Sequence, residues 1–420
     1  MNAQRYLLSL EQIGIKLGLE QITALVRELG HPDRAFRSIV IAGTNGKGSV
    51  TAMVERALRA AGYRTGRYTS PHLVSVSERF AVNGEPLPAE ALDALIERVR
   101  GAALSLPAPP SFFEATTAVA LEAFRQAGVD IAVLEVGLGG RLDATSVVTS
   151  MAAGITAVDF DHEAYLGHTL DAIAREKAAV IHPASVGVLG ANPPDVRAVV
   201  RARCLDVGSP FVYAPDGVQA DATVLNGRTR LDLRTPQDDY PGLQLSLRGR
   251  HQIDNAITAV RLLETLRERG DVGASAEAIR TGVTEAVWPG RLELRTWRQG
   301  EVLIDGAHNP AGAWALARYL DETYRRPLPI VFGAMQDKRI DRMLEALLPA
   351  ASRLICTAPR SSRAASPEDL MRIARSIDSG VPIETEARPL HAVARALESG
   401  SPAVVAGSLY LAGEVGAELS

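Results

Sequence analysis

Cysteine is scarce in this sequence. The 420 residues contain two cysteines, Cys204 and Cys356, which lie far apart and outside any C-x-x-C spacing. This scarcity excludes a disulfide framework and a cysteine-ligated zinc site, and it fits a reducing cytoplasm. Long hydrophobic runs are also lacking, because no stretch approaches the ~20 apolar residues that a membrane span needs. The N-terminal stretch MNAQRYLLSLEQIGIKLGLE carries charges throughout, so we expect a cytoplasmic protein that does not bind membranes.

The sequence also has no excess of positive charge. Its formal net charge is -4, with 45 lysines and arginines against 49 aspartates and glutamates. This balance argues against a general nucleic-acid binder or a binder of anionic membranes. With 46% hydrophobic and 22% charged residues, the composition is that of an ordinary soluble globular protein. A chain of this length predicts two domains, because single hydrophobic cores rarely grow so large.

Short apolar runs alternate with helical patterns, which indicates an α/β fold with parallel strands. Buried strands are expected at Arg37–Ala42, Val129–Val136 and Met151–Val158. Apolar residues at helical spacing predict helices at 48–61 and 169–181. These elements predict a first domain built on a parallel central sheet.

The pattern changes between about Phe211 and Leu247 to short alternating segments such as ATVLNG and LQLSLRG. Such segments predict a small antiparallel insertion in the first domain. Helices return at 251–267 and 275–286, and Ser275 is suited to be the N-cap of the second.

A domain boundary is expected where Pro, Gly and two Trp interrupt the pattern in TEAVWPGRLELRTWRQG. We place the first domain at 1–288, a linker at 289–299 and a second domain at 300–420. Strands and helices alternate again in the second domain, from EVLIDGA to PAVVAGS. This alternation predicts a smaller, Rossmann-like α/β unit.

The stretch IAGTNGKGSV lies between a predicted strand and a predicted helix, the setting in which a glycine-rich loop binds phosphate. The strict pattern G-x-x-x-x-G-K-[ST] fails at both ends, because Ile41 replaces the first glycine and Gly48 follows the lysine. Glycines let backbone N–H groups approach phosphate oxygens. Lys47 would add a positive charge, and Ser49 would offer its hydroxyl to magnesium. The alternative is a glycine-rich turn that binds nothing.

Acidic and imidazole side chains follow the next two predicted strands. Glu135 ends the strand in LEVGLGG, and Asp161 and His162 follow the strand before DFDH. Ligands in open α/β sheets lie beyond the carboxyl ends of the strands, so these groups are placed to hold Mg²⁺ or its waters. Magnesium keeps several waters and needs few protein ligands. Helix capping is the alternative role for Glu135.

Two positions in the first domain's loops and helices, His72 and Lys177, are open to two interpretations. His72 follows a short predicted strand in YTSPHL with Ser70 close by, and a Ser-Pro-His turn is commonly structural. Lys177, in AREKAAV, taken alone is typical of a solvated helix lysine.

The second domain offers one comparable segment, LIDGAHNP. Asp305 and His308 follow a buried strand there, and His308 is either a ligand or a hydrogen-bonding loop residue. Asn309, directly before Pro310, is suited to cap a helix whatever else is true.

Ten stretches together resemble the folylpolyglutamate synthase and dihydrofolate synthase family of the Mur-ligase superfamily. They run from residue 41 to about 414 in the family's order and cover nearly the whole chain. The stretches are IAGTNGKGSV, YTSPHL with SERFAVNGEPL, FFEATTAVA, LEVGLGGRLDAT, DFDHEAYLGHTLDAIAREKAAVI, GRHQIDNA, VWPGRLE, IDGAHNPAGA, FGAMQDK and GSLYLAGE. One motif alone would be weak, whereas ten in order are highly specific.

The resemblance implies an ATP-dependent ligase. ATP phosphorylates a substrate carboxylate to an acyl phosphate, the amine of L-glutamate attacks, and an amide forms with release of ADP and phosphate. The implied acceptor is dihydropteroate, a tetrahydrofolate or both, and we expect a bifunctional enzyme because bacterial relatives of this size often use both. Such chemistry needs an aligned phosphate and neutralised charge rather than a protein nucleophile.

The resemblance also implies roles for individual residues. Gly43, Thr44, Asn45, Gly46, Lys47 and Gly48 match the residues that cradle the phosphates of ATP, with Ser49 at the phosphate and magnesium end. Magnesium ligands are matched by Ser70, Glu135 and His162, to which Ser49 is added. ATP contacts are matched by Asn255, Arg291 and Asp305, and positions near the incoming glutamate by His308 and Ser408. The residues expected to act in catalysis are Lys47, His162, Lys177 and His308.

The resemblance alone changes the interpretation of Lys177 from a solvated helix lysine to a residue of the active site. It matches a lysine that is carbamylated in relatives, where the added carboxylate supports the second of two magnesium ions. The resemblance further implies that ATP binds the first domain and glutamate the second. Closure of the domains would then exclude water from the acyl phosphate. We expect the protein to act as a monomer.

Two departures from the family pattern are visible. Ser146 stands where asparagine usually follows GGRLDAT, and KAAVIHP replaces KAGIIK, with Ala179 for glycine and His182 for lysine. We expect these changes to affect packing and one contact in the cleft, and to leave the magnesium ligands untouched.

Three rival functions remain open. They are a monofunctional folylpolyglutamate synthase, a ligase of peptidoglycan precursors, and a nucleotide switch or plain NTPase with a regulatory second domain. The segments SPHL, HQIDNA and GSLYLAGE favour the folate branch. The guanine-reading N-K-x-D tetrad of a switch is missing from the sequence.

Overall fold

The computed structural model describes residues 2–14, 16–377 and 380–419, which divide into two compact units. Unit 1 comprises Met1–Asp221, Asp232–Leu243 and Asp254–Ala286, and unit 2 comprises Ala222–Leu231, Gln244–Ile253 and Val287–Ser420. The division into 1–288, 289–299 and 300–420 stays a prediction. Within the described ranges, no helix is long and apolar enough to cross a membrane.

Unit 1 contains an eight-stranded sheet with the strand order β4-β3-β2-β5-β1-β6-β7-β8. Its strands are β1 (Arg37–Ala42), β2 (Thr65–Tyr68), β3 (Phe80–Val82), β4 (Glu85–Pro86), β5 (Ile131–Glu135), β6 (Ser150–Ile155), β7 (Val186–Leu189) and β8 (Phe211–Tyr213). Six neighbouring strands, from β2 to β8, run parallel, while β3 and β4 add an antiparallel edge. The mostly parallel fold class is confirmed.

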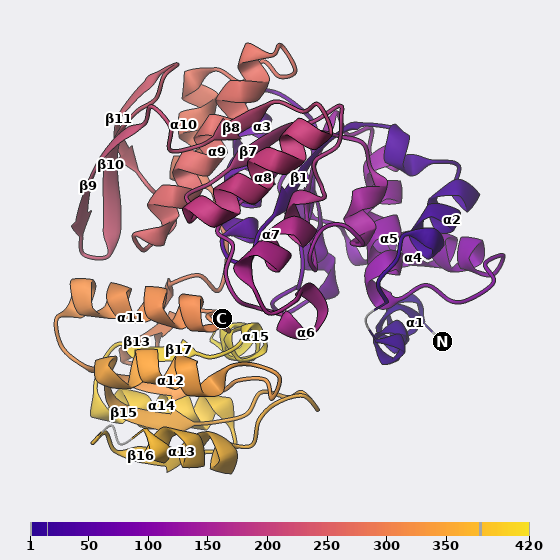
Figure 1. Cartoon of the computed structure of the whole chain (residues 1–420). Helices are drawn as coiled ribbons and strands as arrows, with labels where there is room; N and C mark the ends of the chain where they lie inside the picture. Colours follow the sequence, from indigo (N-terminus) through magenta and orange to yellow (C-terminus); the bar gives the residue numbers. More distant parts are fainter. Residues whose placement is uncertain (1, 15, 378–379, 420) are drawn as a thin grey trace. The chain divides into compact units, whose positions relative to one another are not determined.

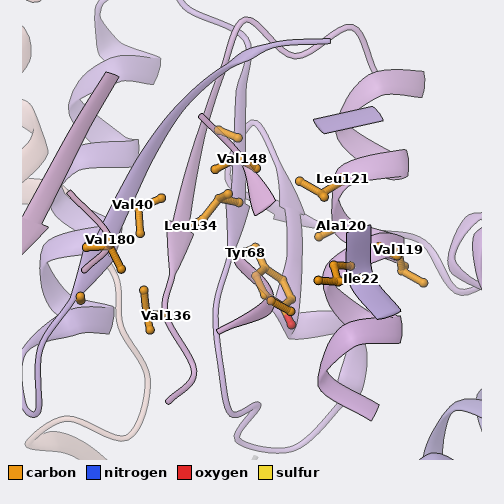
Figure 2. Packing of buried hydrophobic residues seen from close by; sticks show 14 of the residues in the cluster. Ile22, Val40, Tyr68, Val119, Ala120, Leu121, Leu134, Val136, Val148 and Val180 are labelled. Atoms are coloured by element: carbon orange, nitrogen blue, oxygen red, sulfur yellow. The ribbon is translucent and has the colours of Figure 1, made fainter. Parts of the chain in front are cut away.

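Helices cover both faces of this sheet, which explains why its central strands are apolar without alternation. The helices are α1 (Ala3–Ser9), α2 (Glu20–Glu28), α3 (Lys47–Ala60), α4 (Ala89–Ala103), α5 (Phe112–Gln126), α6 (Glu163–Leu166), α7 (Leu170–Ala178), α8 (Pro194–Asp206), α9 (His251–Glu268) and α10 (Ala276–Glu285). On one face, Val40 and Leu134 from adjacent strands belong to one hydrophobic cluster with Tyr68 and with Ala120 and Leu121 of α5, whose side chains lie on the side of the helix that faces the strands (Figure 2). Helices α7 and α8, labelled in Figure 1, contribute to the same cluster.

Helix α3, which begins inside the glycine-rich stretch, packs closely on α10. Gly282 of α10 makes this approach possible, because an added Cβ there would lie 2.6 Å from both the Cβ of Ala57 and the carbonyl oxygen of Met53. Ser275 caps α10, since its hydroxyl accepts a hydrogen bond from Ala278 N at 3.2 Å. The predicted cap is therefore confirmed.

The antiparallel insertion is present but begins later than expected. It comprises β9 (Gln219–Leu225), β10 (Arg228–Arg234) and β11 (Asp239–Gln244), in the order β11-β10-β9. Phe211–Tyr213, which we assigned to the insertion, is instead the edge strand β8 of the main sheet, because it pairs in parallel with β7. A strand of three residues is too short to reveal its partner through alternation.

Unit 2 contains a six-stranded sheet with the order β12-β13-β17-β14-β15-β16. Its strands are β12 (Glu293–Trp297), β13 (Gly300–Ile304), β14 (Leu328–Phe332), β15 (Ala351–Cys356), β16 (Ile383–Thr385) and β17 (Ala403–Ala406). The helices are α11 (Pro310–Tyr324), α12 (Ile340–Leu347), α13 (Pro367–Ser376), α14 (Pro389–Ser399) and α15 (Leu409–Glu418). The sequence pattern missed β12, which pairs antiparallel with β13 in the segment that we interpreted as a break. The second α/β unit itself is confirmed.

The contact between α10 and α3 can be tested with a matched pair of glycine substitutions. Gly282→Ala should lower the free energy of unfolding by about 1–3 kcal/mol, because the added methyl group overpacks this interface. Gly101→Ala, in α4, should instead raise it by up to about 1 kcal/mol, since alanine favours helix and a Cβ at Gly101 meets nothing within 4 Å. Urea unfolding measures both changes. Equal effects of the two substitutions would contradict the tight interface.

Candidate active site

The carboxyl ends of β2, β5, β1 and β6 lie at one edge of the eight-stranded sheet, because these strands are parallel neighbours. Ser70 follows β2, Glu135 ends β5, the loop 43–46 follows β1, and His162 follows β6. The fold therefore collects the predicted groups of the first domain along one edge, the usual place for ligands in such sheets.

The glycines of the loop 43–46 are required by close neighbours. Gly43 has φ 144° and Gly46 has φ 88°, both in the region that favours glycine. A Cβ on Gly43 would lie 1.9 Å from Oγ1 of Thr156, and one on Gly46 would lie 2.3 Å from Oδ1 of Asn255. Asn255, the predicted ATP contact from α9, thus lies directly against the loop.

Hydrogen bonds fix the loop to the end of β6. Thr44 N donates to the carbonyl of Ala157 at 2.7 Å, and the hydroxyl of Thr156 donates to the carbonyl of Asn45 at 2.7 Å. The hydroxyl of Thr44 donates to the carbonyl of Asp159 at 2.9 Å. Gly46, the N-cap of α3, has no side chain with which to form a cap hydrogen bond. The N-terminus of that helix is therefore suited to an anion.

Two lysine side chains converge on the loop. Lys47 Nζ donates to the carbonyl of Thr44 at 3.1 Å, and Lys177 Nζ, from α7, donates to the carbonyl of Gly43 at 2.9 Å. Lys177 is only 5% exposed, so its interpretation as a solvated helix lysine was wrong. Two ammonium groups beside a helix N-terminus make the place favourable for phosphate.

The environment of Lys177 changes its protonation. Burial, followed by the charge of Lys47, lowers the pKa of Lys177 from 10.5 to about 7, while Asp161 and Asp143 act in the opposite direction. In a substantial fraction of the protein molecules, the amine of Lys177 is therefore neutral near pH 7. A neutral lysine amine is a nucleophile, which a solvated lysine at this pH is not.

Two of the four predicted magnesium ligands are in direct contact. Ser70 N donates to the carboxylate of Glu135 at 3.3 Å, and Glu135 is buried. Ser49 is buried in the first turn of α3. In the described residues, no group of three or more His, Cys, Asp or Glu side chains could hold a metal ion. The donor set of one carboxylate and two hydroxyls still fits Mg²⁺, which completes its coordination with water and phosphate oxygens.

His162 lies in the loop after β6 and has a left-handed backbone with φ 52°. Its Nε2 is 3.9 Å from Oδ2 of Asp161, and its backbone N–H donates to Oδ1 of Asp161 at 2.9 Å. Asp161 is also one of the charges that act on Lys177. His162 therefore belongs to the same edge of the sheet, and its role as a ligand stays a prediction.

The turn after β5 is organised by Asp143. Its carboxylate accepts hydrogen bonds from Leu138 N at 2.8 Å and from the N and the hydroxyl of Thr145 at 3.0 and 2.6 Å. Burial raises the pKa of Asp143. Ser146, the departure from the family pattern, donates its hydroxyl to the carbonyl of Gly140 at 2.6 Å. Ser146 therefore closes the same turn.

His182, the other departure, does not contribute to this edge. It lies half-buried before the amino end of β7, which is the opposite edge of the sheet from the loop 43–46. Burial and the charge of Arg203 in α8 lower its pKa. The cleft contact that we expected from these changes was therefore wrong for His182, because α7 ends before it and the chain has already crossed to the other edge.

His72 follows β2 and is positioned by Arg79. Its Nδ1 accepts a hydrogen bond from Arg79 Nε at 2.9 Å, and the guanidinium carbon of Arg79 lies 5.0 Å from the centre of the Phe112 ring. Burial, followed by the charge of Arg79, lowers the pKa of His72 to about 4. His72 is therefore neutral at pH 7, with its proton on Nε2, and the structural role suggested for this turn is supported.

Unit 2 contains the remaining predicted residues. The carboxylate of Asp305 accepts hydrogen bonds from Leu292 N at 2.9 Å and Ala307 N at 2.8 Å. Burial raises its pKa, and Arg291 acts in the opposite direction. A Cβ on Gly306 would lie 2.4 Å from Nη1 of Arg291. The segments 290–292 and 305–307 therefore hold Arg291 and Asp305 beside each other.

His308 and Ser408 follow the adjacent parallel strands β13 and β17. Nδ1 of His308 donates to the carbonyl of Gly306 at 2.8 Å. Ser408 caps α15 through Leu411 N at 3.0 Å, and Asn309 caps α11 through Gly312 N at 2.9 Å. The predicted cap at Asn309 is confirmed. The glutamate contacts of His308 and Ser408 stay predictions.

Sequence reasoning missed three residues that hold the site together. They are Thr156, which contacts the loop, Asp143, which organises the turn after β5, and Arg79, which positions His72. Thr156 is the first polar residue after an apolar strand, and Asp143 follows a glycine pair by three positions. Those positions were usable signals, but the partner of each residue depends on the tertiary fold.

Two family models match the chain. The Mur ligase middle domain matches residues 41–263, and the Mur ligase glutamate ligase domain matches residues 290–409. The dihydrofolate synthase/folylpolyglutamate synthase of Bacillus subtilis is 34% identical over 343 residues, which cover 80% of each chain. The chain belongs to the folylpolyglutamate synthase and dihydrofolate synthase family of Mur ligases. The resemblance derived from the motifs is thereby confirmed.

Some relatives are longer than this chain. A bifunctional folylpolyglutamate synthase/dihydropteroate synthase of Haloferax volcanii is 37% identical over 432 residues, which cover 98% of this chain and 49% of that protein. The chain thus spans about half the length of this relative.

Solved structures of the family have the same fold. The Mycobacterium tuberculosis folylpolyglutamate synthase complexed with ADP and AMPPCP has a TM-score of 0.91 at 33% identity, covering 100% of this chain and 99% of that chain. The Escherichia coli protein in complex with DHPP and ADP has a TM-score of 0.87 at 28% identity, covering 100% and 97%. A bifunctional folylpolyglutamate synthase/dihydrofolate synthase with Mn, AMPPNP and L-glutamate bound has a TM-score of 0.86 at 29% identity, covering 100% and 98%.

The protonation of Lys177 is directly testable, because the chain has four lysines, Lys16, Lys47, Lys177 and Lys338. In metal-free and nucleotide-free protein labelled with ¹³C-lysine, the Lys177 signal should titrate near pH 7, as its pKa of about 7 requires. Lys177→Arg identifies the signal by its loss. A midpoint close to the ordinary lysine value of about 10.4 would show that the amine is solvated.

The same shift has a consequence for stability. Between about pH 7 and 10.5 the unfolded chain binds a proton at Lys177 that the folded chain has released. The free energy of unfolding should therefore rise with pH in this window through this residue.

Proposed function

We propose that this chain is an ATP-dependent ligase that joins L-glutamate to dihydropteroate, to reduced folates, or to both. The observation that carries the proposal is the convergence of Lys47 and Lys177 on the carbonyls of the loop 43–44, beside the N-terminus of α3. The contact of Ser70 with Glu135 at the same sheet edge supports it. The relatives named for both synthase activities support the choice of substrates.

The residues of unit 1 suit the first step of such a reaction. An oxygen of the acceptor carboxylate attacks the γ-phosphorus of ATP, the bond to the bridging oxygen breaks, and ADP leaves with that electron pair. Lys47 and the first N–H groups of α3 would hold the phosphate oxygens, and the charge of Lys47 would favour the extra negative charge of the transition state. Asn255, against Gly46, would contact the nucleotide.

Magnesium would be held by Ser49, Ser70, Glu135 and His162. When bound, the ion neutralises charge on the phosphate oxygens of ATP. Lys177 would take part after carbamylation, in which its neutral amine adds to carbon dioxide and loses a proton to give a carboxylate. The lowered pKa of Lys177 supports this role, because only the neutral amine reacts.

The second step would use residues of unit 2. The nitrogen of L-glutamate attacks the acyl carbon, the amide bond forms and inorganic phosphate leaves with the C–O electron pair. His308 and Ser408 would bind the glutamate, while Arg291 and Asp305 would contact ATP. The match of unit 2 to the glutamate ligase domain supports this assignment. We also propose that the protein acts in the cytoplasm as a monomer.

A ligase assay with paired acceptors tests the proposal. We expect phosphate release only when ATP, L-glutamate and either dihydropteroate or tetrahydrofolate are present together, with a product that is one glutamyl residue heavier by mass spectrometry. Activity with both acceptors supports a bifunctional enzyme, and activity with tetrahydrofolate alone a monofunctional folylpolyglutamate synthase. Vigorous ATP hydrolysis without an acceptor, and no ligated product, would refute the ligase.

Lysine substitutions test the assignment of the loop. Lys47→Ala should reduce kcat by at least about a thousandfold, because the phosphate loses its main positive charge at the reacting end. Lys16→Ala is the matched control, since Lys16 donates to the carbonyl of Pro109 and lies in no part of the proposed site. Circular dichroism verifies that both variants fold. Near-normal turnover in Lys47→Ala would contradict the role of the loop.

A further inference from the structure

The turn between β5 and β6 lies directly on the last turn of α7, the turn that carries Lys177. We infer that Arg141 and Glu176 form a positioning pair that holds Lys177 against the loop 43–46. The inference deepens the proposed function of Lys177 and rests on it for its catalytic consequence. The contacts themselves do not depend on any activity.

Arg141 and Glu176 are joined by a backbone contact and a side-chain contact, which we together call the clamp. The backbone contact is the first of the two. Arg141 N donates to the carbonyl of Glu176 at 3.0 Å. This carbonyl belongs to the last turn of a helix, where such groups lack partners within the helix. Gly140 makes the approach possible, because a Cβ there would lie 2.8 Å from the carbonyl oxygen of Glu176 and 3.0 Å from that of Lys177.

The side chains make the second half. Nε and Nη2 of Arg141 lie 3.0 and 2.9 Å from the same carboxylate oxygen of Glu176. Arg141 is therefore joined to one residue of α7 through both its backbone and its guanidinium. Glu176 is the direct neighbour of Lys177, so the clamp limits the rotation of the helical turn from which the lysine side chain extends.

The turn that presents Arg141 is itself fixed. Asp143 holds it through three hydrogen bonds, and the hydroxyl of Ser146 binds the carbonyl of Gly140. On the other side of the clamp, Lys177 Nζ donates to the carbonyl of Gly43. A continuous series of contacts thus connects the end of β5, where Glu135 lies, with the phosphate loop after β1.

The pair is better suited to positioning than to stabilisation. The side chain of Arg141 is 56% exposed and that of Glu176 is 25% exposed, and an ion pair at the surface contributes little to overall stability. Its loss should therefore leave the fold intact while the turn that carries Lys177 gains freedom. Small misplacement of a reacting group is costly for turnover.

Lysine reactivity in the resting protein provides a readout independent of activity. The full chain is treated with ¹³C-formaldehyde and a borohydride, and the methylation rate of each lysine is followed by NMR. In Arg141→Gln and Glu176→Ala, Lys177 should react about fivefold faster or more, because local opening exposes its amine. Lys16, Lys47 and Lys338 should keep their rates within about twofold.

The ion pair one turn earlier in α7 is the matched control. Asp171 and Arg175 form an exposed i,i+4 pair on the same helix, so Asp171→Asn and Arg175→Gln should leave the Lys177 rate unchanged. The exchanged double variant Arg141→Glu/Glu176→Arg should restore at least part of the protection. An unchanged Lys177 rate in both single variants would overturn the inference, and so would faster reaction of all four lysines, which would mark general unfolding.

Kinetics then separate this inference from the proposed function. In Arg141→Gln and Glu176→Ala, kcat should fall about tenfold while the KM for ATP changes less than about twofold, because the substrate still binds and only the reacting geometry suffers. The melting temperature should fall by less than about 3 °C. A wild type without ligase activity but with the expected labelling would refute the proposed function alone. Normal kcat with faster labelling would overturn the role of the pair in positioning Lys177 for the reaction.

Discussion

The close fit of the loop 43–46 against its neighbours is the constraint on which the rest of unit 1 depends. Thr156 at the end of β6 and Asn255 in α9 leave no space for a side chain on Gly43 or Gly46. The loop carbonyls are consequently held by fixed partners, and the N–H groups at the start of α3 keep one direction. Because an anion is bound by oriented N–H groups, the loop and the start of α3 have a shape suited to an anion without any bound ligand.

The positively charged side chains that contact this loop are lysines, although lysine is rare in the sequence. Of the 45 lysines and arginines, four are lysines, which leaves 41 arginines. Two of the four, Lys47 and Lys177, contact the loop. An arginine stays charged wherever it is placed, whereas burial shifts the pKa of a lysine readily. Lys177 therefore combines two properties that arginine cannot offer here, a compact point charge and a neutral form near pH 7.

Much of the fold was readable from the sequence, and the errors have clear causes. The sequence correctly placed β1, the helix that follows it, and the caps Ser275 and Asn309. Each of these features depends on the local sequence pattern alone. β8 and β12 were misjudged because a short edge strand is defined by its partner rather than by its own residues. His182 was misjudged because the end of α7 decides on which side of the sheet it lies.

The sequence by itself determined the family, the α/β class and the residue types that carry the chemistry, since ten ordered motifs and strand-length apolar runs need no tertiary information. The tertiary structure decided which of these residues meet. Only the order β2-β5-β1-β6 brings Ser70 to Glu135, and only the packing of α7 in the fold brings Lys177 to the carbonyl of Gly43. Contacts between residues more than a hundred positions apart, and the pKa that burial imposes on Lys177, arise from packing, which no local pattern encodes.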